Sequence, residues 1–193
     1  MPNLNFITRQ IATGGDLPYP EEATLRELDE WLELGITHIV DNRHEWSDED
    51  LVASLAPEVR YLHNGVDDAG GHQPDEWFDR GTAWVREALN DPRAKIHIHC
   101  HMGISRGPSL AYAVLLDLGW DPVEAIDGIR AARPIAGVLY ADDALDWHHR
   151  RTRTDETTRR EHRKRLHTWR QEHPLDVVRI IRGIRASEAE SVA

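Results

Sequence analysis

The sequence predicts an α/β protein, with a central, mostly parallel sheet flanked by helices and a helical C-terminal extension. Short apolar runs alternate with stretches whose apolar residues recur at helical spacing over residues 6–118. From residue 122 the pattern is helical almost to the end of the 193-residue chain. This length is sufficient for one domain with a sizeable core and an added segment, which we place at residues 1–147 and 148–193.

Glycine and proline separate the elements in the first part of the chain. "FITRQIAT" at 6–13 is expected to form a strand that ends before Gly14. A helix is expected from about Pro20 to Leu34, because its apolar residues form one stripe and Gly35 follows. The next expected elements are a strand at 36–40, a short helix at 48–56 and a strand at 59–63.

A glycine-rich loop at 64–74 leads into the second part of the predicted domain. We expect a helix at 74–90, a strand at 94–99, and helices from about Arg106 to Leu118 and at 122–132. The strand at 94–99 is expected to be central. Ligands in parallel sheets bind beyond the carboxyl ends of the strands, and Cys100 lies at such an end.

Bulk composition limits the class of protein. The sequence contains no run of about 18 apolar residues, so no membrane span is predicted. The first ten residues do not resemble a secretory signal. Cys100 is the single cysteine, which excludes an internal disulfide and favours a reducing, cytoplasmic location. Residues 1–147 hold 11 basic and 27 acidic residues, whereas residues 148–185 hold 12 basic and 5 acidic ones. The basic extension is expected to pack on or screen the acidic body, with nucleic-acid or membrane contact as the alternative.

The segment "HIHCHMGISRGPS" at 97–109 concentrates the chemistry. A loop between a strand and a helix, with Gly103 to permit a tight turn, can direct backbone N–H groups inward to hold an anion. The positive end of the following helix and the forked donors of Arg106 favour phosphate there. The same positive field favours the thiolate form of Cys100. The segment therefore predicts a nucleophile beneath a bound phosphate.

"HCHMGISR" resembles the H-C-x-x-G-x-x-R signature of cysteine-dependent protein tyrosine phosphatases, and its flanks are most similar to the dual-specificity branch. The resemblance covers about residues 4–147. It implies a phosphatase that acts on protein phosphotyrosine, and on phosphoserine or phosphothreonine, through a phosphocysteine, with no cofactor or metal. It also implies phosphate binding by the loop residues, which are His101, Met102, Gly103, Ile104, Ser105 and Arg106.

The resemblance implies two further roles. An aspartic acid on a neighbouring loop protonates the leaving oxygen, and "VDDAGG" supplies Asp68, which we favour, or Asp67. His99 is expected to brace the loop by hydrogen bonding. One departure from the family pattern is Gly107, where relatives usually place a serine or threonine that helps the sulfur leave. We therefore expect a phosphoenzyme to accumulate, and Gly107→Ser to raise turnover.

Other readings remain open. The histidines at 97, 99 and 101 could be metal ligands, although strand alternation places His97 and His99 on the face opposite Cys100. A phosphate-binding module with slow or no turnover is a second alternative, favoured by Gly107. An RNA or phosphoinositide phosphatase of the same superfamily is a third. Asp142 or Asp143 is a weak candidate for orienting water after "ARPIAGVLY".

Two parts of the extension have different patterns. Residues 150–173 are strongly basic, and Leu166 and Trp169 are their main apolar anchors, which predicts a solvated helix or one docked at an edge. Residues 174–186 predict a helix packed on the domain, with a dimer contact or a membrane surface as alternatives. Its expected apolar stripe is Leu175, Val178, Ile181 and Ile184, with Arg179, Arg182 and Arg185 facing outward.

Overall fold

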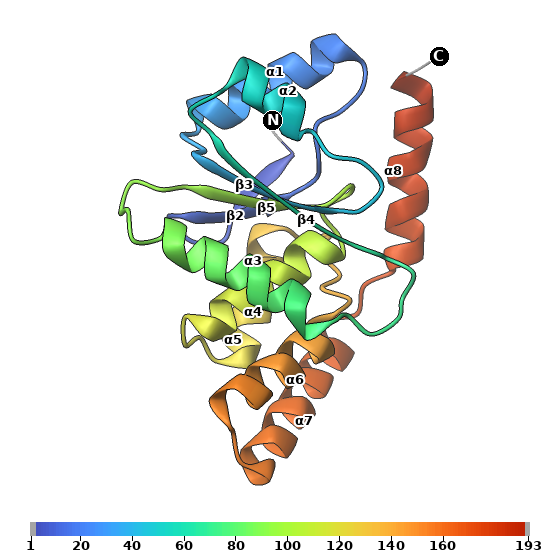
Figure 1. Cartoon of the computed structure of the whole chain (residues 1–193). Coiled ribbons are helices and arrows are strands. Elements are labelled where there is room, and N and C mark those ends of the chain that lie inside the picture. The colour runs from blue at the N-terminus through green and yellow to red at the C-terminus, as the bar shows by residue number, and fades with distance from the viewer. Residues whose placement is uncertain (1–2, 192–193) are drawn as a thin grey trace.

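A five-stranded sheet forms the centre of the protein, whose computed structural model describes residues 3–191 (Figure 1). The strand order is β1-β2-β5-β3-β4, with β1 antiparallel to β2 and the other neighbours parallel. The strands are β1 (Leu4–Phe6), β2 (Ile11–Gly14), β3 (His38–Arg43), β4 (Arg60–Val66) and β5 (Ile96–His99). The predicted fold class is confirmed, and β5 is the central strand, as expected.

Helices cover both faces of the sheet. The helices are α1 (Glu21–Glu33), α2 (Glu49–Leu55), α3 (Asp75–Ala88), α4 (Arg106–Asp117), α5 (Pro122–Ala132), α6 (Ala141–Thr152), α7 (Glu156–Glu172) and α8 (Val177–Ser191). α1 and α2 lie on one face, where Leu28, Trp31 and Val52 belong to a small core. α3 and α4 lie on the other face, within a larger core that extends into α5, α6 and α7. Burying apolar side chains on both faces stabilises the parallel sheet.

The predicted strand at 6–13 is wrong in one respect, because the segment forms two strands instead of one. Residues 7–10 turn between β1 and β2, which pair in an antiparallel hairpin. The Thr8 Oγ1 atom accepts hydrogen bonds from the backbone N–H groups of Gln10 and Ile11. A threonine side chain that bonds the backbone two or three residues on stabilises a turn, and apolar periodicity does not reveal such a turn.

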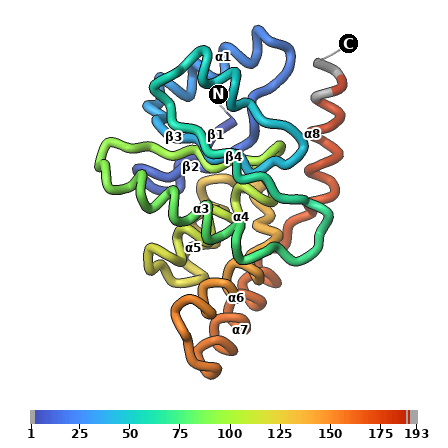
Figure 2. The backbone as a smooth tube through the Cα atoms, viewed as in Figure 1, coloured from blue at the N-terminus to red at the C-terminus, as the bar shows by residue number. Residues whose placement is uncertain are grey.

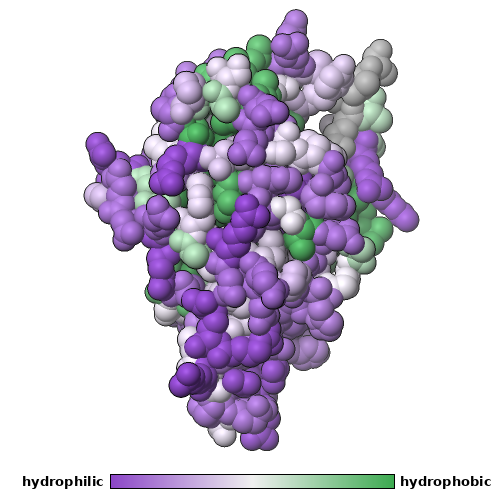
Figure 3. Space-filling view, viewed as in Figure 1, coloured by the Kyte–Doolittle hydropathy of each residue, from purple (hydrophilic) through white to green (hydrophobic). Residues whose placement is uncertain are grey.

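The first part of the basic extension packs on the acidic body. Leu166 and Trp169 of α7 are buried in the larger core, so this helix is docked. The arginines of α6 and α7 form ion pairs with aspartates, which are Arg150–Asp75, Arg151–Asp79, Arg163–Asp146, Arg165–Asp121 and Arg170–Asp142. The face seen in Figure 3 is hydrophilic over this end of the molecule. α6 runs across residue 147, and the division at that point stays a prediction.

α8 differs from the other helices because it stands beside the layered body (Figures 1 and 2). Its half-buried apolar residues are Val177, Ile180, Ile181 and Ile184. The predicted stripe is wrong at Val178, which is 59% exposed, because the helix begins at Val177 and turns that residue outward. No helix among the described residues is long and apolar enough to cross a membrane.

Candidate active site

The candidate site lies where the parallel strands end. The loops after β2, β3, β4 and β5 supply Asp16, Glu45, Asp68 and Cys100, respectively. Glu45, Asp68 and Cys100 line one cavity of about 380 Å³, together with residues 101–102 and 104–106. Cys100 is 2% exposed, so its thiol lies at the floor of this cavity. The sequence-predicted loop, acid and nucleophile are therefore brought together.

The carbonyl groups of the loop face away from the cavity. The oxygens of His101, Met102, Gly103 and Ile104 accept hydrogen bonds from Asp16 N–H, from Arg133, and from the N–H groups of residues 137 and 138. In a planar trans peptide the following N–H points opposite to the carbonyl, so N–H groups 102–105 turn inward. None of these four N–H groups donates to another residue that the structure describes. The loop therefore presents a set of unoccupied donors above Cys100.

Arg133 holds the loop from behind. Its guanidinium donates to the carbonyls of Gly103 at 2.7 Å and Met102 at 2.9 Å, and to the side-chain oxygens of Asn5 and Asn3. All four acceptors are uncharged amide oxygens, and burial lowers the pKa of Arg133, opposed by Cys100. Gly103 has φ +63°, and a Cβ there would collide with the Gly14 carbonyl and the Arg133 guanidinium. Glycine is thus required at this position by both conformation and packing.

Arg106 begins α4 and is 2% exposed. Its Nη1 and Nη2 donate to the two carboxylate oxygens of Glu45 at 2.7 and 2.9 Å, and Nη1 also donates to the Val66 carbonyl. Nε lies 3.4 Å from Asp68 Oδ2 but forms no hydrogen bond with another described residue. Burial disfavours the charge, but the Glu45 bond and the nearby Cys100 and Asp68 raise the pKa of Arg106. The unused Nε donor is available to an anion in the cavity.

Glu45 was not singled out from the sequence. Burial raises its pKa, but the hydrogen bonds from Arg106 outweigh burial and lower the pKa of Glu45 to about 2. It is 61 positions from Arg106 in the chain, and no local motif marks the pair. A phosphate that enters the cavity must share or displace the donors that Glu45 occupies.

Asp68 and Asp67 both line the cavity. Asp68 Oδ1 accepts hydrogen bonds from the hydroxyl groups of Ser105 at 2.8 Å and Tyr140 at 2.7 Å. Oδ2 is the carboxylate oxygen nearer to Arg106 Nε. The Asp67 carbonyl accepts from Gln73, whereas its side chain is exposed. The structure therefore orients Asp68 toward the loop, through Tyr140, a residue that sequence reasoning missed.

Asp143 stabilises the loop that carries Asp67 and Asp68. Its carboxylate accepts from the Gln73 backbone N–H at 3.0 Å and contacts His72 Nδ1 at 2.7 Å. Asp142 pairs with Arg170 of α7. Both side chains are thus engaged in holding segments together, and neither lines the cavity around Cys100.

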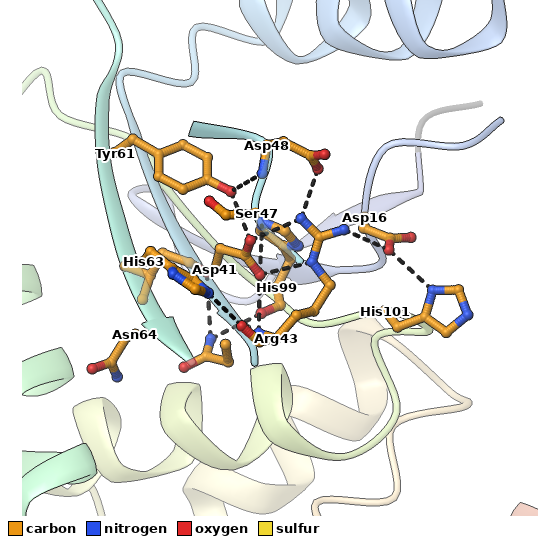
Figure 4. Close-up of polar contacts among 12 residues, drawn as sticks. Asp16, Asp41, Arg43, Ser47, Asp48, Tyr61, His63, Asn64, His99 and His101 are labelled. Atoms are coloured by element: carbon orange, nitrogen blue, oxygen red, sulfur yellow. Dashed lines mark hydrogen bonds and ion pairs between the residues drawn. The ribbon is translucent and has the colours of Figure 1, made fainter. Parts of the chain in front are cut away.

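A buried polar network lies under the loop (Figure 4). Arg43 is fully buried and donates to Asp41, Asp16 and Asp48, and Tyr61 donates to Asp41 at 2.7 Å. Burial disfavours the guanidinium charge, but hydrogen bonds to Asp41 outweigh it and raise the pKa of Arg43. Asp16 also contacts His101 Nδ1 at 3.0 Å, which joins the network to the loop.

His99 faces this network. Its Nε2 lies 3.9 Å from Asp41 Oδ1, and burial lowers the pKa of His99. Its Nδ1 has no hydrogen-bond partner among the described residues. The His97 ring packs edge-on against the Trp31 ring, with 4.4 Å between the ring centroids. Among the residues that the structure describes, no group of three or more His, Cys, Asp or Glu side chains is arranged to hold a metal ion.

Gly107 packs tightly against β5 and the start of the loop. A Cβ there would lie 2.9 Å from the His99 carbonyl carbon and 3.0 Å from the Cys100 nitrogen. Backbone atoms cannot move aside as a flexible side chain can. The Ser109 hydroxyl already forms two hydrogen bonds, because it donates to the Ser105 carbonyl and accepts from the Tyr140 N–H. The expectation that Gly107→Ser simply adds a useful hydroxyl overlooked this packing.

Comparisons with known proteins agree with this geometry. No family model matches the chain. It is 30% identical over 127 residues to dual specificity protein phosphatase 13B of Mus musculus, covering 63% of this chain and 64% of the relative. It is 32% identical over 117 residues to dual specificity protein phosphatase 26 of Rattus norvegicus, covering 58% and 56%. The chain thus spans less than two thirds of the length of these relatives.

Solved structures share the fold. The active form of Tk-PTP aligns with a TM-score of 0.60 at 23% identity, over 75% of this chain and 95% of that chain. PTPMT1 in complex with PI(5)P aligns with a TM-score of 0.62 at 17% identity, over 78% and 97%.

The sequence matches are dual specificity protein phosphatases, and the structural matches share the fold of this chain. The chain is therefore dual-specificity phosphatase-like in sequence over the matched residues, with a cysteine at the end of the central strand and an arginine at the start of the next helix.

Proposed function

We propose that the chain is a cysteine-dependent phosphatase that hydrolyses phosphomonoesters through a phosphocysteine intermediate. Its proposed substrates are proteins that carry phosphotyrosine, and phosphoserine or phosphothreonine. The observation that carries the proposal is the loop at 100–106, whose carbonyls bond outward while four N–H groups face the cavity above Cys100. Donors fixed in this way stabilise the oxygens of a phosphoryl group as charge shifts during transfer.

Each proposed step uses a group already in place. The Cys100 thiolate attacks phosphorus while the bond to the leaving oxygen breaks, and Asp68 gives its proton to that oxygen. Water then attacks the phosphocysteine, Asp68 takes a proton from it, and the thiolate leaves. Arg106 binds phosphoryl oxygens through the unused Nε and by exchange with Glu45. His99 was expected to brace the loop by hydrogen bonding, but its Nδ1 has no partner among the described residues and its Nε2 lies 3.9 Å from Asp41, so its proposed role is limited to its place beside the Asp41–Arg43 network. No metal or cofactor takes part in the proposed steps.

One observation favours a second candidate, a phosphate-binding module with slow turnover. The position after Arg106 has no hydroxyl, and the β5 backbone leaves no room for one. Without that hydroxyl, departure of the sulfur is slow and phosphocysteine accumulates. The two candidates share the first chemical step and differ in the rate of the second.

Hydrolysis of p-nitrophenyl phosphate from pH 5 to 8 tests the proposal. We would compare the wild type with Cys100→Ser, Asp68→Asn and the matched neighbour Asp67→Asn, with EDTA and with vanadate. Activity that survives EDTA, falls with vanadate and disappears in Cys100→Ser supports the thiolate mechanism. Loss in Asp68→Asn but not in Asp67→Asn supports the acid assignment. A burst followed by a slow steady state supports slow dephosphorylation, whereas vanadate binding without any turnover favours the binding module. Activity that EDTA abolishes would contradict the proposal.

A further inference from the structure

The cavity around Cys100 is completed by α8, which lies beyond the segment that resembles phosphatases. Ile181 and Arg185, one helical turn apart, both line this cavity. Ile184 and Ser187, on the same side of the helix, line a second cavity of about 760 Å³ that shares His101 and Met102 with the first. α8 therefore contributes to the lining of both cavities. Arg185 is exposed, as expected, and it also lines this cavity, which was not expected.

The side of the Cys100 cavity formed by α8 has an apolar part, Ile181, above a charged floor. The half-buried residues of α8 recur at the spacing of one contacting helix face. Ile181 of this face and Leu139, which is 49% exposed, both line the cavity that contains Cys100. The floor carries Arg106, Glu45 and Asp68. A phosphate on the floor and an apolar ring between the walls is the arrangement that an aryl phosphate would fill.

Among the described residues, Arg185 of α8 is not ion-paired in the way that the arginines of α6 and α7 are. Five arginines of α6 and α7 pair with aspartates. In contrast, the Arg185 guanidinium forms no hydrogen bond or ion pair with any other side chain in the described part of the chain. Arg106, the other arginine of the cavity, is already paired with Glu45. A second anionic group on a substrate would therefore meet Arg185.

We propose that Ile181 and Arg185 determine substrate specificity, with Ile181 contacting the ring of a phosphotyrosine and Arg185 pairing with an acidic residue beside it. The inference rests on the proposed function, since it names the substrate class of the same site as phosphotyrosyl peptides with an acidic neighbour.

Paired substitutions in the full chain test the proposal. Arg182 is exposed and lines neither cavity, so Arg182→Gln is the matched control for Arg185→Gln. Val178 is also exposed and lines neither cavity, so Val178→Ala is the matched control for Ile181→Ala. Substrates are p-nitrophenyl phosphate and two phosphotyrosyl peptides that differ only in an acidic or neutral neighbour.

Arg185→Gln is expected to lower kcat/KM for the acidic peptide by about two- to five-fold, mainly through KM, as for one exposed ion pair. The neutral peptide and p-nitrophenyl phosphate should be unaffected, and high salt should remove the difference. Arg182→Gln should behave as the wild type on all three substrates. Ile181→Ala should lower kcat/KM for all three by about two- to five-fold, since less apolar surface is buried against the ring.

Three outcomes separate this inference from the proposed function. Equal behaviour of Arg185→Gln and Arg182→Gln in an active enzyme overturns the inference and leaves the proposed function standing. A higher kcat for Ile181→Ala on every substrate also overturns it, because α8 would then be a cover. If the wild type hydrolyses none of the esters, the proposed function fails, and calorimetry of the acidic peptide with Cys100→Ser decides the inference alone. If the double variant Cys100→Ser, Arg185→Gln binds the acidic peptide more weakly than Cys100→Ser does, the inference is supported. If the two variants bind the peptide equally, the inference is overturned.

Discussion

Replacing Arg133 by methionine should damage the proposed chemistry far more than the fold. The substitution keeps the length of the side chain but removes the donors to the carbonyls of Met102 and Gly103. Each buried carbonyl left without a partner costs about 1–3 kcal/mol. Removing a guanidinium whose charge is disfavoured by burial returns part of that cost, so we expect a net loss of about 2 kcal/mol of unfolding free energy.

The effect on catalysis follows from the peptide planes. With those two carbonyls released, the N–H groups of Gly103 and Ile104 lose their fixed inward direction. Loss of one preorganised donor to a developing oxyanion lowers kcat by about 10²- to 10³-fold. We therefore expect a fall in kcat/KM of at least about 10²-fold for Arg133→Met.

Urea unfolding followed by tryptophan fluorescence, together with p-nitrophenyl phosphate kinetics, measures both quantities. Leu166→Ala is the control, because it removes a fully buried α7 side chain and should cost about 2–5 kcal/mol away from the cavity. This control should keep kcat/KM near the wild-type value under native conditions. The reasoning is refuted if Arg133→Met is destabilised but retains kcat/KM within about three-fold, which is far less than loss of a single donor costs.

Three other predictions concern packing, charge and pH. Gly107→Ser should lower stability by about 1–3 kcal/mol and lower turnover too, because its Cβ meets the β5 backbone; a urea midpoint at the wild-type value would contradict this. Glu45→Gln should tighten vanadate binding several-fold, because it removes a negative charge that occupies the Arg106 donors, and weaker binding in a vanadate titration would show instead that Glu45 is needed to position Arg106. Burial and then His162 lower the pKa of His149 from 6.5 to about 4, so the unfolded state binds more protons below pH 6.5 and stability should fall on acidification. Between pH 7.5 and 5 this group should account for about 2 kcal/mol of unfolding free energy, and the drop should be smaller by that amount in His149→Asn.

Much of the fold and part of the site could be predicted because their signals are local. The strand before Cys100 and the helix after it lie within one continuous segment, and topology places the end of such a strand at the ligand-binding edge. Asp68 was found through the family resemblance, which implies an acid on a neighbouring loop, and it lies on the loop that follows β4.

The missed residues act across long separations in the chain. Arg133 contacts the loop from the end of α5, and Tyr140 reaches Asp68 across 72 positions. Nothing in the residues next to Arg133 or Tyr140 indicates which groups they will meet. The position of α8 was also beyond local reasoning, because apolar periodicity predicts a contacting face but not the surface that the face will contact. The same limit explains why the place of Arg185 at the cavity was not predicted.

The arginine network under the loop has a consequence for how this protein can change over evolutionary time. Arg43 donates hydrogen bonds to Asp16, Asp41 and Asp48. Loss of the arginine would leave all three carboxylates without this ion-pair partner, whereas loss of one aspartate would leave Arg43 paired with the other two. Effects within such a connected group are not additive. In an alignment of homologues, these positions should therefore vary together or remain fixed. Because Asp16 also contacts His101, the same constraint should extend to the identity of the first loop residue after the cysteine.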